Sequence, residues 1–244
     1  MIPKKIHYIW LGGNEEPEIL KKCKESWKKY CPDYEIIKWD ESNLDLDCCD
    51  YCRQAYDAKK FAFASDVVRF DILYKEGGIY LDVDVELLKP LDNLLTHKCF
   101  MGFEHSEALA PGLIMGAEKE CKTVQDLFES YKKDKFIMED GSYNLNTICI
   151  RTTDYLVEKG LKLDNSKQQI DGVDIYPTEY FCPINPITNK KKITDKTYSV
   201  HLYYASWFNK KAKIKKIIKR VLNFLTNGKF GVWLYNKKKE NSIK

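Results

Sequence analysis

Two aspartates lie two residues apart in the segment GGIYLDVDV, residues 77–85. Because apolar residues alternate with acids here, the pattern predicts a strand whose period of two places Asp82 and Asp84 on one face. Two carboxylates in one small volume repel each other unless a cation neutralises them. Oxygen ligands suit a hard ion such as Mg²⁺ or Mn²⁺, which also binds phosphate. The pair predicts metal-assisted binding of a diphosphate, although a bare Asp-x-Asp is more often an ordinary acidic strand edge.

A second pair of charged residues precedes the aspartates. Residues 57–76 have the apolar periodicity of a helix, which stops at Gly77-Gly78. Asp66 and Arg69 are three residues apart and therefore share a face of this helix. The ordinary interpretation is a weak local ion pair. The functional one is that Asp66 accepts a hydrogen bond from a sugar hydroxyl while Arg69 donates to sugar or phosphate oxygens.

The surrounding pattern predicts an α/β fold. Residues 5–11 and 34–39 have the composition of strands, and residues 17–30 between them have a helical apolar pattern. Strand, helix and strand in succession favour a parallel sheet, at whose carboxyl edge ligands collect. Further predicted elements are a helix at 123–132 and strands at 99–103, 113–116, 174–177 and 198–201.

The composition is that of a soluble globular protein. The 244 residues are 44% hydrophobic and 31% charged, and no apolar run approaches the roughly 18 residues that span a bilayer. The first residues run into a predicted strand and not into a signal peptide, so a cytoplasmic location is expected. The nine cysteines are an odd number scattered along the chain, which favours free thiols in a reducing compartment.

Charge divides the chain into two predicted parts. Residues 208–244 hold eleven lysines, one arginine and one acid, a net charge of +11, which leaves −7 for residues 1–207. Between Lys213 and Leu225 the apolar residues form a helical stripe opposite a lysine-rich face. Such a helix can lie on an anionic membrane, although it can equally pack on the domain. We expect a catalytic domain at 1–207 and a basic amphipathic tail at 208–244, placed at the inner face of the cell membrane.

The block ASDVVRFDILYKEGGIYLDVDV (residues 64–85), preceded by IPKKIHYIW and followed by HLYYASW, resembles glycosyltransferase family 32. This family of DXD sugar transferases includes bacterial capsular and surface polysaccharide enzymes, and large cytotoxin glucosyltransferase domains share its donor-site pattern. The resemblance covers roughly residues 1–207. It implies a GT-A fold, a Rossmann-like mixed sheet flanked by helices, and retaining transfer from a nucleoside-diphosphate sugar, most simply UDP-linked, to a glycan or lipid-linked glycan.

The resemblance also implies roles for particular residues. Asp84 matches the direct ligand of a divalent Mn²⁺ or Mg²⁺ ion, and Asp82 matches a contact to the ribose and to the water shell of the metal. Asp66 and Arg69 match contacts to the donor sugar. Tyr80 matches a residue that lines the same pocket.

Two more segments have implied roles at the ends of the domain. Trp10 matches an aromatic residue that stacks on the nucleotide base. His201 and Ser206 match residues that complete the metal shell, and Trp207 matches one that covers the diphosphate. This chain departs from the family at Gly141-Ser142, where a Gly-Pro turn is common, and at Val200, where a second histidine often precedes the motif.

The mechanism and two other function classes stay open at this point. No residue identifies itself as a covalent nucleophile, so we favour front-face attack by the acceptor over double displacement. A metal-dependent nucleotidyltransferase also uses paired acids, but its Gly-Ser turn usually precedes the Asp-x-Asp. A non-catalytic module that binds membrane or nucleic acid is the third class. The acidic body shows no nucleic-acid motif, so no nucleic-acid partner is expected.

Overall fold

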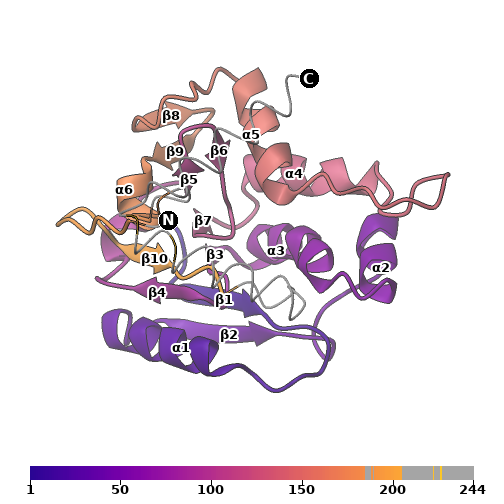
Figure 1. The fold of residues 1–244 in the computed structure, drawn as a ribbon, viewed down its shortest axis with the longest axis horizontal. Coiled ribbons are helices and arrows are strands. Elements are labelled where there is room, and N and C mark those ends of the chain that lie inside the picture. Colours follow the sequence, from indigo (N-terminus) through magenta and orange to yellow (C-terminus); the bar gives the residue numbers. More distant parts are fainter. Residues whose placement is uncertain (185–187, 189, 205–221, 223–225, 227–244) are drawn as a thin grey trace.

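The computed structural model describes residues 1–184, 188, 190–204, 222 and 226, which build a mixed sheet covered by helices (Figure 1). The predicted tail at 208–244, apart from two isolated residues, lies outside the described residues, as do Ser206 and Trp207. The strands are β1 Lys5–Ile9, β2 Glu35–Trp39, β3 Gly78–Tyr80, β4 Val85–Leu87, β5 Cys99–His105, β6 Ala108–Leu109, β7 Met115–Ala117, β8 Gln168–Ile170, β9 Val173–Tyr176 and β10 Ser199–His201. The helices are α1 Glu18–Tyr30, α2 Asp50–Asp57, α3 Phe61–Glu76, α4 Lys122–Lys132, α5 Ile148–Glu158 and α6 Thr178–Phe181, with a 3₁₀ turn at Asp92–Leu94.

The main sheet has the order β2-β1-β3-β7-β5-β9-β8, with β6 paired to β5. β1 is parallel to both β2 and β3, as the succession of strand, helix and strand predicted. β7 is antiparallel to its neighbours β3 and β5, so β3 and β5 point in the same direction. A smaller sheet pairs β4 with β10 in antiparallel fashion. The carboxyl ends of β1, β3 and β5 therefore meet at one edge of the main sheet.

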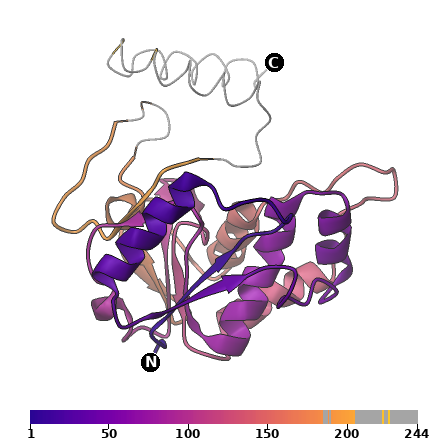
Figure 2. The same ribbon diagram turned by 90° about the horizontal axis from the view of Figure 1, so that it is seen from below.

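Apolar side chains cover both faces of the main sheet. On β1, Ile6 and Tyr8 join a core with α1, whereas Ile9 joins a second core with α2, α3, α4 and α5. The alternation follows the period of two of a strand that is buried on both sides. Figure 2 shows α1 and α3 on opposite sides of the central strands. The fold is thus a three-layer α/β arrangement.

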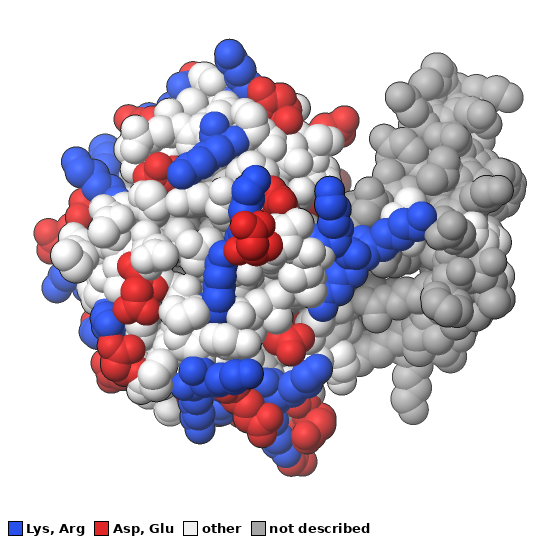
Figure 3. Space-filling view, turned by 90° about the vertical axis from the view of Figure 1, so that its left-hand side faces the viewer, with Lys and Arg blue, Asp and Glu red and all other residues white. Residues whose placement is uncertain are grey.

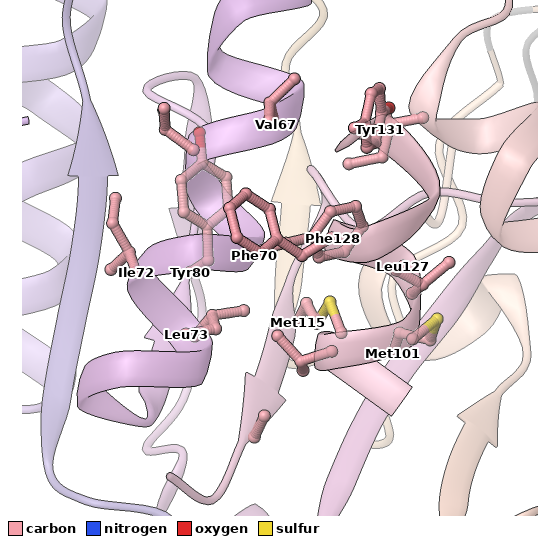
Figure 4. Close-up of a cluster of buried hydrophobic side chains, with 14 of the residues drawn as sticks. Val67, Phe70, Ile72, Leu73, Tyr80, Met101, Met115, Leu127, Phe128 and Tyr131 are labelled. Carbon is pink, nitrogen blue, oxygen red and sulfur yellow. The ribbon is translucent and has the colours of Figure 1, made fainter. Parts of the chain in front are cut away.

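Helix α3 is the most buried helix of the described part of the chain. Val67, Phe70 and Leu73 are fully buried and pack with α4 residues and with Met101 and Met115 of the sheet (Figure 4). The helix ends at Gly77, whose φ of 62° suits glycine. A Cβ at this position would lie 2.8 Å from the Lys119 backbone nitrogen. This close approach turns the chain directly from α3 into β3.

Two predicted elements differ from the structure. The helix expected at 57–76 is confirmed over Phe61–Glu76, but its expected start is wrong, because α2 ends at Asp57 and α3 begins at Phe61. Lys59, with φ of 57°, breaks the helical path between them. The single strand expected across 77–85 is also wrong, because β3 ends at Tyr80. A turn follows, in which the Val85 amide nitrogen lies 3.1 Å from the Asp82 carbonyl oxygen and donates to it.

The described surface carries both signs of charge. Lysine and arginine side chains are interspersed with acidic ones on the face in Figure 3. Ion pairs such as Lys24 with Glu16 and Lys4 with Asp33 lie on this exterior. Within the described residues, none of the helices has both the length and the apolar character that crossing a membrane requires.

Candidate active site

Asp82 and Asp84 lie in the turn between β3 and β4, at the carboxyl edge of the main sheet. The antiparallel pairing of β4 with β10 places His201 opposite Val85, and so beside Asp84. One ligand atom from each of Asp82, Asp84 and His201 lies within 4.8 Å of the others. The two aspartates converge as expected, but a turn brings them together and not the period of a strand.

Asp84 is buried and receives two hydrogen bonds. Its Oδ1 lies 3.0 Å from His201 Nε2, and its Oδ2 accepts from the Tyr204 amide at 2.6 Å. Burial by itself would raise the pKa of Asp84, but these hydrogen bonds and the charge of His201 lower it. Burial would lower the pKa of His201, but Asp84 raises it. Both shifts favour an ionised Asp84 next to a protonated imidazole in the absence of a metal ion.

The buried side chain of Arg69 forms ion pairs with two aspartates. Its side chain is 4% exposed, and it donates to Asp66 Oδ1 at 2.8 Å and to Asp82 Oδ1 at 3.2 Å. Its remaining donors include Nε, which is bonded to the Ser65 carbonyl, and its guanidinium lies 4.5 Å from the centre of the Tyr80 ring. Most of the donor fork is therefore used inside the protein. This geometry makes Arg69 a positioning residue for Asp66 and Asp82.

Two further groups fix the carboxylate of Asp82. The Tyr80 hydroxyl donates to Asp82 Oδ1 at 3.1 Å, and Tyr80 itself is 2% exposed. The Asp82 amide donates to the Gly112 carbonyl at 3.0 Å. A Cβ on Gly112 would lie 2.2 Å from Asp82 Oδ2, closer than any real contact. Only glycine at position 112 leaves room for this carboxylate.

The side chain of Asp66, a residue of α3, lies beside the start of α5. The backbone of Ile148, the first residue of that helix, hydrogen-bonds to Asp66. Burial raises the pKa of Asp66 to about 6, and Asp82 contributes in the same direction, whereas Arg69 opposes the rise. The side chain is 13% exposed. The carboxylate of Asp66 is therefore mostly buried, and only a small part of it is open to a ligand.

The residues of the cluster fit a divalent cation. His201 Nδ1 is buried without a hydrogen-bond partner among the described residues, so one imidazole nitrogen has no protein group to satisfy it. The two carboxylates supply oxygen ligands that suit Mn²⁺ or Mg²⁺, and the imidazole adds one nitrogen donor. Asp82, Asp84 and His201 are therefore the residues that would hold the ion.

Trp10 follows β1 and so lies on the same sheet edge as Asp82. Its side chain is partly exposed, and its indole nitrogen donates to the Asn14 carbonyl at 2.8 Å. The hydrogen bond uses only the indole nitrogen, so the faces of the ring could still stack on a base. That stacking stays a prediction. Ser206 and Trp207, expected to close the site, lie outside the described residues.

Sequence reasoning missed the groups that come from the backbone and from loops. These are the amides of Tyr204 and Ile148 and the whole of Gly112. A backbone amide carries no signal in the residue type. Gly112 was detectable in part, because Pro111-Gly112 is a turn signature. What it contacts depends on the arrangement of distant strands.

The comparisons with known proteins converge on this region. Residues 17–101 match the family described as “Glycosyltransferase sugar-binding region containing DXD motif”. “Inositol phosphoceramide mannosyltransferase 3” of Schizosaccharomyces pombe is 41% identical over 104 residues, which are 41% of this chain and 29% of that protein. “Uncharacterized glycosyltransferase L373” of Acanthamoeba polyphaga mimivirus is 25% identical over 85% of this chain and 84% of its own. The chain spans under a third of the length of the first of these relatives.

A solved structure supports the fold. The “PaToxG Glycosyltransferase” superposes with a TM-score of 0.50 at 20% identity, over 65% of this chain and 70% of its own. The fold is the GT-A type that the family resemblance implied. The matched residues 17–101 contain Asp66, Arg69, Tyr80, Asp82 and Asp84, so the two aspartates of the cluster, but not His201, lie within a DXD glycosyltransferase region. These matches support the glycosyltransferase class.

Proposed function

We propose that this protein is a metal-dependent, retaining glycosyltransferase that moves a hexose from a nucleoside-diphosphate sugar to a glycan or lipid-linked glycan. The observation that carries the proposal is the convergence of Asp82, Asp84 and His201 at the carboxyl edge of β3. Arg69 and Asp66 on α3 adjoin this cluster, so sugar-binding and diphosphate-binding groups are neighbours. A UDP-linked donor and a surface polysaccharide acceptor are the simplest versions.

Each part of the site has a role in this reaction. A divalent ion held by the cluster would act as a Lewis acid that stabilises the departing diphosphate. Asp82 is oriented by Arg69 and Tyr80, so its free oxygen can face the ribose and the hydration shell of the ion. Asp66 lies beside the same guanidinium, where its carboxylate can accept from a sugar hydroxyl and stabilise positive charge at the anomeric carbon.

The proposed route to retention of the anomeric configuration depends on whether a carboxylate of the site could act as a covalent nucleophile. Asp66 is hydrogen-bonded to Arg69 and to the start of α5, which fixes its carboxylate in place and lowers its nucleophilicity while leaving its negative charge near the sugar. Front-face attack by the acceptor, held beside the departing phosphate, needs no protein nucleophile. We therefore favour this route to retention over double displacement.

The test is a panel of UDP-sugars, with a mannose donor included because matched relatives are named inositol phosphoceramide mannosyltransferases. Donor hydrolysis is followed with and without Mn²⁺ or Mg²⁺ by release of free nucleoside diphosphate, and the anomeric configuration of a transferred sugar by NMR. Release of pyrophosphate would instead identify a nucleotidyltransferase. Absence of any metal-dependent turnover across the panel would overturn the proposal and favour a non-catalytic binding module.

We further propose that residues 1–207 form the catalytic domain and that the lysine-rich segment 208–244 contacts an anionic membrane at the cytoplasmic face. The support is the charge of +11 in that segment against −7 in the remainder. Each basic residue near such a surface adds about 1 kcal/mol of attraction. Replacing Lys213, Lys215, Lys216 and Lys219 by glutamine should weaken sedimentation with phosphatidylserine vesicles and leave donor hydrolysis intact. Equal vesicle binding by the variant would sink this part of the proposal.

A further inference from the structure

A third acidic residue lies at the sheet edge that carries Asp82. Met115 of β7 pairs with Tyr80 on one side and with Met101 on the other. Asp82 is two residues beyond Tyr80, and Glu104 is three residues beyond Met101 on the parallel strand β5. The two acids therefore lie at nearly the same height, separated by about two strand spacings, or roughly 10 Å. Glu104 is partly exposed, so its carboxylate can be reached from outside.

The chain itself bridges the space between these two acids. In the loop after β6, the Ala110 amide donates to the Gly102 carbonyl of β5 at 3.1 Å, and the Gly112 carbonyl accepts from the Asp82 amide at 3.0 Å. Ala110, Leu113 and Cys182 form a small buried apolar cluster there. The loop after β6 thus contacts both Asp82 and the strand that carries Glu104, over a small buried apolar cluster.

Tyr203 lies between Glu104 and His201, one of the three candidate metal ligands. Its hydroxyl is hydrogen-bonded to Glu104 and lies 2.9 Å from Cys182 Sγ. The centre of its ring lies 4.2 Å from that of His201. One aromatic side chain therefore contacts both the acid and the candidate metal ligand.

The backbone of Tyr203 is strained. Its φ of 52° lies in the left-handed region, which a bulky residue rarely adopts. This conformation turns the chain so that the next amide, from Tyr204, donates to Asp84 while the Tyr203 hydroxyl reaches Glu104. Strain that serves two polar contacts at one site is typical of a functional constraint.

We propose that Glu104, positioned by Tyr203, accepts a hydrogen bond from a hydroxyl of the acceptor, so that this part of the edge forms the subsite for a sugar or cyclitol acceptor. The inference rests on the proposed transferase function, because it places the second substrate of that reaction. A partly exposed carboxylate held by a tyrosine hydroxyl can bind a polyol, since the acid accepts hydrogen bonds from its hydroxyls. Glu104 contacts the acceptor, and Tyr203 acts through Glu104.

The test separates acceptor binding from donor chemistry. Saturation-transfer NMR titrations of the full chain are run with UDP and the diamagnetic ion Mg²⁺. They use three probes, namely methyl α-D-glucopyranoside, methyl α-D-mannopyranoside and myo-inositol. Glu104→Gln should weaken binding of the best probe by about 10-fold or more, as expected for loss of a hydrogen bond to a charged group. Hydrolysis of the donor by water should fall much less than probe binding does, because Glu104 reaches His201 only through Tyr203.

The control is Glu107→Gln, which removes the same charge from an exposed position in the turn after β5. Tyr203→Phe should weaken the probe more than it lowers donor hydrolysis, whereas a merely structural role would lower both equally along with the melting temperature. Equal probe binding by wild type and Glu104→Gln overturns the inference, and so does the absence of saturable binding of all three probes to wild type. Failure of the wild-type protein to hydrolyse any donor refutes the transferase function separately.

Discussion

His201 Nε2 and Asp84 Oδ1 lie 3.0 Å apart, although 117 residues separate the two positions in the sequence. The pairing of β4 with β10 produces this contact, because it aligns His201 with Val85, the residue after Asp84. The second strand of a small sheet thus supplies one of the three candidate metal ligands. An early and a late segment of the chain must both be in place before the cluster exists.

Asp84→Asn should therefore abolish metal-dependent turnover with the fold retained. The amide keeps the shape of the side chain but removes the charge that faces His201 and the cation. We expect Mn²⁺ affinity, measured by calorimetry, to fall by at least about 100-fold, since even partners of metal ligands change affinity by 10- to 100-fold. Circular dichroism checks that the variant is folded. Turnover like that of the wild type would remove Asp84 from the metal site.

The sequence was sufficient to predict the α/β class and the early strands. The alternation in β1, the helical pattern of α1 and the strand β2 follow from local periodicity, and the structure confirms them. The meeting of Asp82 and Asp84 was also expected, but from a wrong local structure. The β3 strand ends at Tyr80 because the Val85 amide bonds back to the Asp82 carbonyl, a contact that residue types do not reveal.

Long-range packing explains what the sequence could not reveal. Asp66 and Arg69 share a helix face as their spacing indicated, yet the donors of Arg69 are largely used by Asp66, Asp82 and Ser65. The role of an arginine depends on which acids surround it, and Asp82 reaches it only because α3 packs over β3. The same holds for Gly112, whose importance comes from the carboxylate that occupies the place of its missing side chain.

Gly112→Ala tests this steric arrangement. The new Cβ would lie 2.2 Å from Asp82 Oδ2 and 2.8 Å from Arg69 Nη1, so the carboxylate must move. A displacement of about 1 Å at a catalytic group can cost about 100-fold in rate, and we expect a loss of kcat of that order. The matched control is Gly102→Ala, where the Cβ would lie 2.6 Å from Phe181 Cδ2 in the core. The control should lower the melting temperature more than it lowers kcat, and the opposite ranking would contradict the argument.

Arg69→Met should destabilise the protein as well as inactivate it. The guanidinium is buried and holds the carboxylates of Asp66 and Asp82, which the variant leaves without their cation. Removing one partner of a buried charge network costs about 3 kcal/mol or more, measured as the free energy of unfolding in urea. Arg53→Met is the control, because Arg53 pairs with Asp47 on the surface and should change stability by less than about 1 kcal/mol. Similar losses in the two variants would show that Arg69 is not a structural clamp.

The buried side chain of His7 should make the unfolding free energy of the protein depend on pH. It is fully buried, its Nε2 lies 2.8 Å from the Gly77 carbonyl, and its Nδ1 accepts from the Trp39 indole at 3.0 Å. These partners suit the neutral ring with the proton on Nε2. Burial lowers the pKa of His7 to about 4, although the Gly77 hydrogen bond opposes the shift.

Because the ordinary pKa of histidine is 6.5, the unfolded chain binds more protons at His7 than the folded protein does between pH 6.5 and 4. The contribution of His7 is therefore fully present above pH 6.5 and is lost as the pH falls through this window, by about 3 kcal/mol in total. Urea unfolding of wild type and His7→Gln at half-unit pH steps isolates the effect, since other titrating groups cancel in the difference. The difference in unfolding free energy should shrink steadily below pH 6.5, and a difference independent of pH would show that His7 is protonated in the native protein.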